Sequence, residues 1–499
     1  MINLSSFVRY HASRGPERTA IVFEGRQVSY AELWQRVQTL AGWLAARGIG
    51  EGEVVAVFMK NSPAFIETAL ATSHLGGVFL PVNYRLATDE AAYIQENAGA
   101  RLLLADDEFE GIVGGLENTV LLGAAERRDI RALTGETEPP PMCRREPGDL
   151  FRLMYTSGTT DRPKGVMHSY DNFYWKCMDH VIDLGLSAED RLLVVGPLYH
   201  VGAFDLPGLA VMWVGGTLSI VREFEEEAVL GAIEAGKLTC GWLAPVMLGR
   251  LLAWPDRERF DRSSVKWMIG GGEKTPESRI RAFNQLFPNG RYIDAYGLTE
   301  TCSGDTLMEA GREIEKIGST GRALAHCEID IRDDDGNALP PGTQGEICVR
   351  GPKVTTGYWK DPDKTRASFF ADGWFRTGDV GVLDAEGFLT ITDRKKDLII
   401  SGGENISSSE VERVIYALPQ VAEAAVIGVP DADWGERPIA VVVPRPGETL
   451  DYATLREHCR AHLARFKVPR ELHLREALPR NPSGKILKRT LRDEFAPRA

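Results

Sequence analysis

The sequence lacks the features that mark secreted and membrane-spanning proteins. Its seven cysteines are odd in number and scattered, and no two of them form a Cys-x-x-Cys pair, which indicates reduced thiols rather than a disulfide framework. No apolar run reaches the roughly 20 residues that span a bilayer. The stretch Met1–Phe7 has no basic region before an apolar core, so we expect no signal peptide.

The sequence also has fewer basic than acidic residues. Lys and Arg number 58 against 71 Asp and Glu, which gives a formal net charge of −13. This balance argues against broad binding to nucleic acids or acidic membranes, because such surfaces require a positive field. Any polyphosphate ligand must therefore be held by a locally basic pocket. We expect a cytoplasmic protein with no nucleic-acid partner and no integral membrane contact.

The first half of the chain alternates between helix and strand patterns. Ser29–Glu32 has the form of a capping box, and apolar residues at helical spacing follow it until Gly48. The pattern predicts a further helix over Pro63–His74 between buried strands at Val54–Phe58 and Val78–Val82. Further strands are predicted at Leu192–Val195, Leu218–Val221, Gly241–Ala244 and Val265–Ile269, and a helix at Glu225–Ala235. Such alternation favours an α/β fold with a mostly parallel sheet and helices on both faces.

The second half changes character. After about Gly318, glycines and prolines punctuate short alternating runs, which predicts a β-rich region. A smaller α/β unit begins near Leu398, and the charged run Asp393–Asp397 before it indicates a domain boundary. In this unit the pattern predicts a helix from Ser407 to Leu418, strands at Ala424–Gly428 and Ala440–Val443, and a helix over Leu455–Leu463. With 499 residues, two to four domains are expected.

The stretch Tyr155–Gly165 is dense in small hydrogen-bond donors. Its hydroxyls, its glycines and the Lys164 ammonium have the chemistry of a polyphosphate cradle. It departs from a P-loop, because Pro163 precedes the lysine where that motif has Gly, and Gly165 follows where it has Ser or Thr. On its own the stretch fits a surface loop rich in turn formers better, and only the other motifs of the chain can favour the phosphate site.

Three further stretches carry chemistry that packing does not explain. Asp294–Glu300 places an aromatic ring, a glycine, a hydroxyl and a carboxylate in one turn after a predicted strand, where α/β sheets bind ligands. Trp374–Asp379 ends in a carboxylate suited to the two hydroxyls of a ribose, although a turn cap would look the same. Asn481–Ile486 presents Lys485 on a tight loop, and a lone lysine there also fits a solvated surface.

Taken together, these stretches resemble the adenylate-forming superfamily of acyl-CoA synthetases, acyl adenylases and luciferases. The match covers essentially the whole chain, in order, at Tyr155–Gly165, Gly270–Gly272, Tyr296–Glu300, Gly318–Gly321, Thr377–Asp379, Asp393–Asp397, Ser401–Ile406 and Pro482–Lys485. The resemblance implies a large N-terminal AMP-binding domain of parallel and mixed sheets plus a β-rich region (1–393), a hinge (394–396) and a small mobile C-terminal α/β domain with the catalytic lysine (397–499).

The resemblance also implies the reaction. A carboxylate attacks the α-phosphate of ATP to give acyl-AMP and pyrophosphate, and CoA then takes the acyl group and releases AMP. It assigns catalysis to Lys485, Glu300, Thr156 and His200, and Mg²⁺ binding to Glu300 and Thr156, since Mg²⁺ prefers oxygen ligands. The implied nucleotide contacts are Thr156, Ser157, Gly158, Thr159, Thr160, Lys164, Gly271, Gly272, Glu273, Asp294, Ala295, Tyr296, Gly297, Thr299, Asp379 and Arg394.

For the thioester step the resemblance implies that the small domain rotates about Lys396. Contacts with coenzyme A are implied for Gly402, Gly403, Trp434, Phe466 and Lys467. Two departures from the family pattern stand out. Val468 lies where some aryl-CoA ligases carry Arg, and Asp161 lies in the phosphate loop where Gly is usual. We expect Asp161 to point away from the phosphates, toward Arg162.

The acid substrate is the least determined part. His200 resembles a residue at the mouth of the acyl pocket, although a structural histidine is an alternative. Candidate pocket walls are Tyr174, Val201, Phe204, Trp242 and Met268, which favour an uncharged aryl or aliphatic tail. The expected substrate is thus an aromatic or a medium- to long-chain fatty acid.

Two other functions stay open at this stage. One is an acyl-AMP ligase that loads a carrier protein, and the other is a nucleotide-binding protein without turnover. The partners we expect are a small carboxylic acid, ATP and CoA, with a homodimer left open. We interpret His458 and His462 as a helix face rather than a metal site, and Cys302 as a bystander.

Overall fold

A computed structural model of the chain describes residues 3–135, 137–156, 162–271, 277–401, 404–431, 434–480 and 486–495. The chain divides into two compact units. The first comprises Met1–Ile329, Val349–Phe375 and Gly387–Leu389, and the second comprises Asp330–Cys348, Arg376–Glu386 and Thr390–Ala499. Within the described residues, no helix is long and apolar enough to cross a bilayer.

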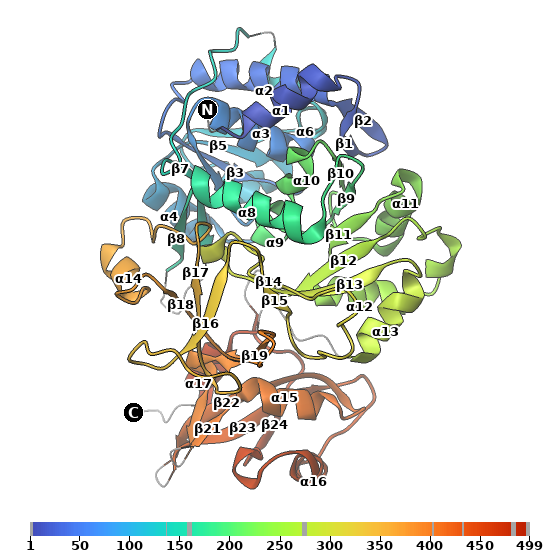
Figure 1. The fold of residues 1–499 in the computed structure, drawn as a ribbon, viewed down its shortest axis with the longest axis vertical. Coiled ribbons are helices and arrows are strands. Elements are labelled where there is room, and N and C mark those ends of the chain that lie inside the picture. Colours follow the sequence, from blue (N-terminus) through green and yellow to red (C-terminus); the bar gives the residue numbers. More distant parts are fainter. Residues whose placement is uncertain are drawn as a thin grey trace. The chain divides into compact units, whose positions relative to one another are not determined.

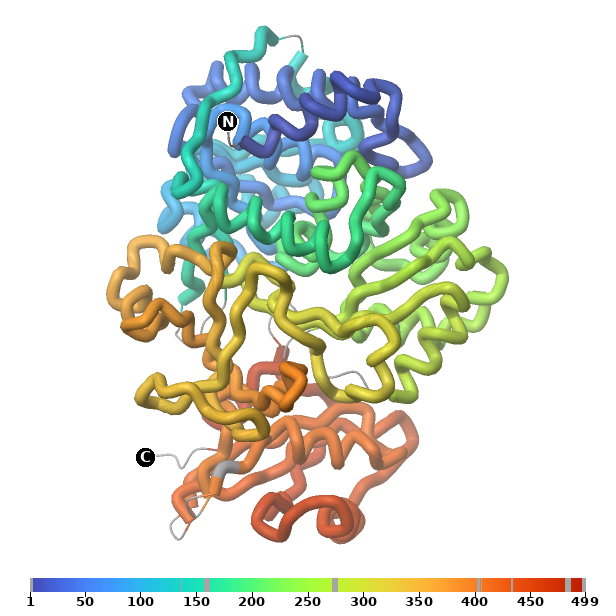
Figure 2. Tube along the Cα trace, in the orientation of Figure 1, coloured from blue at the N-terminus to red at the C-terminus, as the bar shows by residue number. Residues whose placement is uncertain are grey.

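The first unit contains a nine-stranded sheet of order β15-β14-β13-β12-β11-β9-β10-β1-β2. Its strands are β1 (Thr19–Phe23), β2 (Arg26–Ser29), β9 (Arg191–Val194), β10 (Thr217–Ile220), β11 (Cys240–Trp242), β12 (Trp267–Gly271), β13 (Arg291–Tyr296), β14 (Thr306–Leu307) and β15 (Arg322–Ala323). The run from β13 to β1 is parallel, and the strands at both edges are antiparallel. In Figure 2, the dark blue start of the chain lies beside the green strands, as the pairing of β1 with β10 requires.

A second, six-stranded sheet has the order β6-β5-β3-β4-β7-β8. Its strands are β3 (Val54–Phe58), β4 (Val78–Pro81), β5 (Ala100–Asp106), β6 (Thr119–Leu122), β7 (Leu150–Thr156) and β8 (Lys164–Ser169). All neighbours are parallel except β7 and β8, which form an antiparallel pair. The predicted α/β fold with parallel and mixed sheets is confirmed.

The longer helices of the first unit cover these sheets (Figure 1). Its helices are α1 (Ser5–Arg14), α2 (Tyr30–Ala45), α3 (Pro63–His74), α4 (Thr88–Ala98), α5 (Glu110–Val113), α6 (Ala124–Arg128), α7 (Arg131–Thr134), α8 (Tyr170–Leu184), α9 (Val201–Phe204), α10 (Leu209–Trp213), α11 (Glu226–Gly236), α12 (Pro245–Ala253), α13 (Glu277–Leu286) and α14 (Pro362–Ala367). Helix α3 is buried on every side, and its buried residues include the polar side chains of Glu67, Thr68, Thr72, Ser73 and His74 as well as apolar ones. The capping box at Ser29 is half formed: Ser29 caps the Glu32 amide, but the Glu32 carboxylate pairs with Arg36 and Arg131 instead.

The second unit is built on a hairpin of two long antiparallel strands, β22 (Val421–Asp431) and β23 (Gly435–Pro444). Its sheet also contains β20 (Ile399–Ser401), β21 (Glu404–Ile406) and β24 (Leu472–Leu474), and its helices are α15 (Ser408–Tyr416), α16 (Tyr452–His462) and α17 (Lys488–Phe495). A four-stranded sheet falls largely in this unit and contains β16 (Glu328–Arg332), β17 (Gly345–Arg350), β18 (Phe375–Leu383) and β19 (Leu389–Arg394). Helices α15 and α17 pack against β22.

Candidate functional site

The predicted phosphate loop is closed at its base by two strands. Thr156 ends β7 and Lys164 begins β8, and these two residues are register partners in the antiparallel pair. The Lys164 ammonium lies 3.3 Å from the Asp361 carboxylate and is 22% exposed. The loop ends are thus fixed, with a hydroxyl on one and a cation on the other. Asp161, with its neighbours in the loop, lies outside the described residues, so its predicted orientation stays a prediction.

Several other predicted contacts also lie outside the described residues. They are Ser157, Gly158, Thr159, Thr160, Gly272, Glu273, Gly402, Gly403 and Lys485.

Two neighbouring parallel strands bring the predicted nucleotide residues to one sheet edge. Gly271 ends β12 and is the register partner of Ala295 in β13, next to Tyr296. A Cβ atom on Gly271 would lie 2.7 Å from the Ala295 carbonyl oxygen, and one on Gly297 would lie 2.3 Å from the Gly304 nitrogen. Glycine is therefore required at both positions for the backbone to approach this closely. Asp294 and Tyr296 are both buried in this edge.

Glu300 lies in the short 3₁₀ turn Thr299–Thr301 that follows β13, and three hydrogen bonds from two other segments hold this turn. The Thr355 amide donates to the Glu300 carbonyl over 2.7 Å. The Tyr358 hydroxyl donates to Glu300 Oε1 over 2.9 Å. His168 Nε2 lies 2.7 Å from the Thr299 carbonyl. The position of the carboxylate is therefore set by contacts from β8 and from the segment 355–358.

A fully buried set of ions lies beneath this turn. Arg152 pairs with Asp205 at 2.8 Å and also donates to His168 Nδ1, so Nε2 of this imidazole carries the proton toward Thr299. Burial and the nearby Arg152 guanidinium hold the pKa of His168 well below its usual range, so the ring stays neutral. The Lys353 ammonium lies 3.3 Å from Asp305 and also contacts the Gly304 carbonyl.

The residues expected at the acyl pocket divide into two groups. Phe204 and Met268 pack in the hydrophobic core and are almost fully buried, so they do not face open space. Tyr174 is half-buried and its hydroxyl donates to the Asn3 carbonyl. Trp242 and Val201 are half-buried and stay candidates for the wall.

The indole of Trp242 packs against two glycines, Gly196 and Gly202, which lie on either side of His200 in the sequence. A Cβ atom on Gly196 would lie 2.6 Å from the indole ring, and one on Gly202 would lie 2.8 Å from it. His200 is half-buried beside Tyr199, with ring centroids 4.7 Å apart. Burial, with a smaller contribution from the Arg85 charge, lowers the pKa of His200 to about 4. His200 is therefore a neutral imidazole at pH 7.

In the second unit, the structure brings Asp379 and Arg394 together. Arg394 Nε lies 3.4 Å from Asp379 Oδ1, and this carboxylate is almost fully buried. The turn before it is shaped by Thr377, whose hydroxyl donates to the Ile347 carbonyl and accepts from the Asp379 amide. Gly378 has a φ of +72°, a left-handed conformation that favours glycine. A buried carboxylate held in this way has the chemistry to accept two hydroxyl donors.

The residues predicted to contact coenzyme A are surface residues of the second unit. Trp434 is 50% exposed and Phe466 is 36% exposed. Lys467 lies against the Phe466 ring and pairs with Glu410 at 2.6 Å. Lys396 is exposed, and partial desolvation together with the neighbouring Arg394 lowers the pKa of its ammonium. Their predicted roles stay predictions.

His458, His462 and Cys302 make the contacts of ordinary structural residues. His458 bonds to the Val414 carbonyl and packs on His462, and no group of potential metal ligands occurs in the described part of the chain. Cys302 is buried, and burial raises the pKa of its thiol to about 12, so it carries no thiolate.

Sequence reasoning did not identify Tyr358, Lys353, Arg152 or His168 as neighbours of Glu300. Tyr358 lies in the β-rich region predicted after about Gly318, where no motif marks it as a neighbour of Glu300. No local pattern links His168 to Thr299, because 131 residues separate them in the chain.

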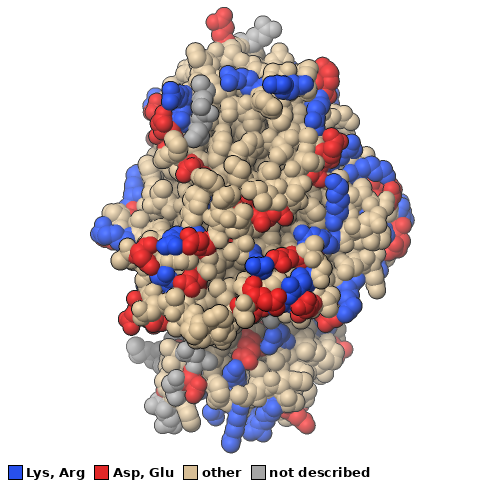
Figure 3. All heavy atoms as spheres, viewed as in Figure 1, with Lys and Arg blue, Asp and Glu red and all other residues tan. Residues whose placement is uncertain are grey.

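The residues present fit a magnesium–nucleotide complex in their chemistry. Glu300 and Thr156 have oxygen atoms of the kind that Mg²⁺ prefers, Lys164 has a cation suited to phosphate, and Gly271 has no side chain that would block a flat ring. On the face shown in Figure 3, acidic and basic side chains are intermixed, and this face has no broad basic surface.

Comparisons with known proteins agree with this reading. The AMP-binding enzyme family model matches residues 8–359, and the AMP-binding enzyme C-terminal domain model matches residues 410–485. The chain is 37% identical over 492 residues to a feruloyl-CoA synthase of an Amycolatopsis species, covering 99% of both chains. It is 35% identical to an indoleacetate–CoA ligase of Aromatoleum aromaticum, covering 99% of this chain and 98% of that one. It is 34% identical to a long-chain-fatty-acid–CoA ligase of Mycobacterium tuberculosis, covering 99% of both.

Solved structures match over the whole chain as well. ATP-bound MatB from Rhodopseudomonas palustris has a TM-score of 0.90 at 31% identity, covering 99% of both chains. The o-succinylbenzoate CoA synthetase of Bacillus subtilis in complex with its acyl-adenylate intermediate has a TM-score of 0.88 at 33% identity, covering 98% of both. The same synthetase with ATP and a magnesium ion has a TM-score of 0.87 at 32% identity, again covering 98% of both.

Proposed function

Because this chain belongs to the AMP-binding enzyme family, and is an AMP-forming acid–thiol ligase that uses ATP, Mg²⁺ and coenzyme A, we propose that the acid it activates is an aromatic carboxylic acid. The proposal covers acids with a short linker between ring and carboxylate, such as arylpropenoates and arylacetates. Two of the relatives, a feruloyl-CoA synthase and an indoleacetate–CoA ligase, are named for acids of this kind.

The observation that carries the proposal is the position of Trp242. Its indole fills the space left by the missing side chains of Gly196 and Gly202. A long flexible acyl chain would have to displace this ring, whereas a planar acid can stack on it at low cost in conformational entropy. The neutral His200 beside it adds no charge that would need a counter-ion on the substrate.

ATP with Mg²⁺ supplies the electrophilic α-phosphorus and the pyrophosphate leaving group. The protein's part is to neutralise and orient charge, because the attacking carboxylate and the phosphates repel each other. In our proposal Lys164 and Thr156 hold the phosphates and Glu300 holds the metal. Asp379, oriented by Arg394, accepts the ribose hydroxyls, and Lys485 stabilises the charge that develops at the α-phosphate.

A second candidate substrate is an acid with a second carboxylate. Arg85 is exposed and donates to the Tyr199 hydroxyl over 3.1 Å, and its charge reaches His200. A guanidinium at this position is a suitable partner for a remote carboxylate. An o-succinylbenzoate CoA synthetase is among the matching structures, which makes this acid the natural test of the candidate.

The test is a panel of acids scored by AMP release with ATP and CoA. It contains ferulate, indoleacetate, octanoate, palmitate and 2-succinylbenzoate, and thioester formation is measured in parallel. We expect an arylpropenoate or arylacetate to give the highest kcat/KM. A preference for palmitate would overturn the aromatic assignment, and a preference for 2-succinylbenzoate would favour the second candidate.

A Trp242→Ala variant sharpens the comparison. Removing the indole should raise the octanoate-to-ferulate ratio of kcat/KM by about 10-fold, because pocket volume separates substrates by factors of this order. Trp254→Ala serves as the matched control, because Trp254 packs on Phe260 in a different hydrophobic cluster. An unchanged ratio in Trp242→Ala would remove the wall role of this residue.

A further inference from the structure

We propose that Tyr358 is a positioning residue for the Glu300 carboxylate, linking it to the strand that carries Lys164. The inference rests on the proposed function in one respect, which is that Glu300 is the Mg²⁺ ligand. Tyr358 contacts both the Glu300 carboxylate and the backbone of β8.

The first step is the hydrogen bond itself. The Tyr358 hydroxyl donates to Glu300 Oε1 over 2.9 Å, and the tyrosine ring is almost fully buried. A charge-assisted bond of this kind restricts rotation of the carboxylate about its last single bond. In metal sites, groups that bond to a ligand and do not touch the metal usually set the ligand's orientation in this way.

The second step is the backbone of Tyr358, which is bound to β8. Tyr358 forms an antiparallel bridge with Val166. The Met167 amide donates to the Gly357 carbonyl over 3.0 Å, and the Trp359 amide donates to the Gly165 carbonyl over 2.7 Å. Lys164, the proposed phosphate ligand, is the first residue of β8. Tyr358 therefore connects the strand of Lys164, through its backbone, to the proposed metal ligand Glu300, through its side chain.

The third step is that the backbone that follows the Glu300 turn has an unfavourable conformation. Cys302, Ser303 and Gly304 have φ values of +55°, +67° and +72°, so three consecutive residues after the Glu300 turn adopt left-handed conformations. Non-glycine residues reach this region at a cost and keep it only when their surroundings enforce it. The turn is therefore held by its partners more than by its own preferences.

The fourth step is that the segment carrying Tyr358 is itself anchored. The side-chain Nδ2 of Asn172 donates to the carbonyls of Pro352 and Val354, 2.8 Å in each case. Between them, the fully buried Lys353 contacts Asp305 and the Gly304 carbonyl. The segment thus reaches the turn from a rigid base, as a positioning group must.

The experiment compares Tyr358→Phe with wild type by Mn²⁺ binding in the presence of a non-hydrolysable ATP analogue, followed by electron paramagnetic resonance. Phenylalanine keeps the ring and removes only the hydroxyl. We expect Mn²⁺ to bind about 10- to 100-fold more weakly, as for other groups that support metal ligands. In activity assays the KM for Mg²⁺ should rise, and kcat at saturating Mg²⁺ should fall by a smaller factor.

Two further variants make the result decisive. Tyr30→Phe removes another buried hydroxyl, one that donates to the Gly216 carbonyl over 2.7 Å, and should leave Mn²⁺ binding unchanged. Glu300→Gln tests the metal ligand itself. Normal Mn²⁺ binding in Tyr358→Phe, with weakened binding in Glu300→Gln, overturns the positioning role and leaves the proposed function intact. Normal binding in Glu300→Gln overturns the ligand assignment on which the inference rests, and equal weakening in Tyr30→Phe overturns the specificity of the Tyr358 effect.

Discussion

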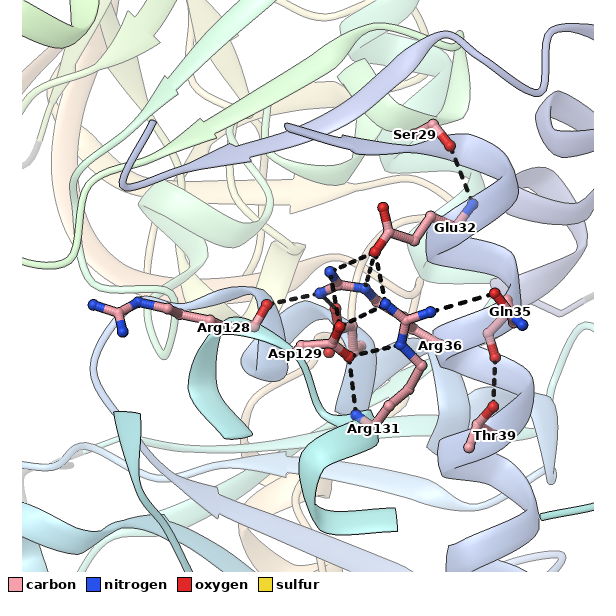
Figure 4. Close-up of polar contacts among 9 residues, drawn as sticks. Ser29, Glu32, Gln35, Arg36, Thr39, Arg128, Asp129 and Arg131 are labelled. Atoms are coloured by element: carbon pink, nitrogen blue, oxygen red, sulfur yellow. Dashed lines mark hydrogen bonds and ion pairs between the residues drawn. The ribbon is translucent and has the colours of Figure 1, made fainter. Parts of the chain in front are cut away.

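At the scale of single residues, the first unit contains a carboxyl group in an unusual environment. Glu67 lies on the all-buried helix α3 and is fully buried, with one oxygen 3.0 Å from Arg36. Its second oxygen has no hydrogen-bond partner among the described residues. Arg36 is shared with Glu32 and Asp129, as Figure 4 shows for the labelled residues, so Glu67 receives only part of this charge.

This environment predicts a pH-dependent stability. Burial raises the pKa of Glu67 to about 7, although Arg36 opposes the shift. Between pH 4.5 and 7 the folded state therefore binds more protons at this site than the unfolded state. As pH rises across this window, the free energy of unfolding should fall by about 1–3 kcal/mol. Above pH 7 it should level off.

Urea denaturation at pH 5 and pH 8 measures the effect. Glu67→Gln cannot ionise, so its stability should change less between these two values than that of wild type. Glu17→Gln, at an exposed position, is the control. A wild-type fall that persists undiminished in Glu67→Gln would show that other groups cause it.

Lys485 is predicted to act in the adenylation step alone. Lys485→Ala should abolish adenylation, measured as acid-dependent pyrophosphate exchange, because it removes the cation that we propose stabilises the charge developing at the α-phosphate. Thioester formation from supplied acyl-AMP should stay largely intact. Equal loss of both half-reactions would contradict a role confined to the first step.

At the scale of elements, α17 follows the predicted catalytic loop, and two basic side chains of this helix form ion pairs with other parts of the second unit. Lys488 lies 2.8 Å from Glu412 of α15 and 2.6 Å from the Ser408 hydroxyl, which in turn donates to Asp393. Arg492, one turn further along α17, lies 2.7 Å from Asp397. The two aspartates flank the predicted hinge residues 394–396. The helix therefore ties the end of the catalytic loop to both sides of that segment.

We expect Lys488→Met to lower the stability of the protein by about 1–3 kcal/mol, because it leaves Glu412 buried without its cation. Burial already raises the pKa of Glu412, and the Lys488 ammonium opposes that shift. Arg489→Ala, on the exposed side of the same helix, should cost less than about 0.5 kcal/mol. Adding Glu412→Gln to Lys488→Met should restore part of the loss in thermal denaturation, and additive losses would argue against the pairing.

Elements with strong local patterns were predictable from the sequence. The helix Pro63–His74 and the strand Val54–Phe58 occur with the predicted bounds, because proline, apolar runs and short loops all favour them. The Glu300 turn was found through its residue types, but its support was not. Lys353, His168 and Tyr358 reach the turn through contacts between distant segments, which periodicity and turn chemistry do not encode. The same reason explains Phe204 and Met268, whose apolar character suits a pocket wall and a core equally.

At the scale of the whole molecule, the boundaries of the two compact units differ from those of the predicted domains. Residues 330–348 and 376–386 group with the C-terminal part. Compactness describes packing, whereas a hinge describes motion, so the boundary at 394–396 stays a prediction. The local structure suits a hinge: Lys395–Asp397 is a single 3₁₀ turn between β19 and β20, and such short connections are where domain rotations concentrate.

Lys396→Pro tests this hinge. Proline fixes φ near −65° and restricts the residue before it, so a rotation that requires a change of φ at this position is blocked. In the predicted scheme adenylation precedes the rotation, so it should change little, whereas thioester formation should fall by at least about 10-fold. Pyrophosphate exchange measures the first step, and CoA-dependent AMP release from supplied acyl-AMP measures the second. Lys396→Ala separates loss of the side chain from loss of backbone freedom, since alanine removes the ammonium and keeps φ free. If both half-reactions decline equally in the proline variant, or if alanine reproduces its effect, the backbone at position 396 does not turn the domain.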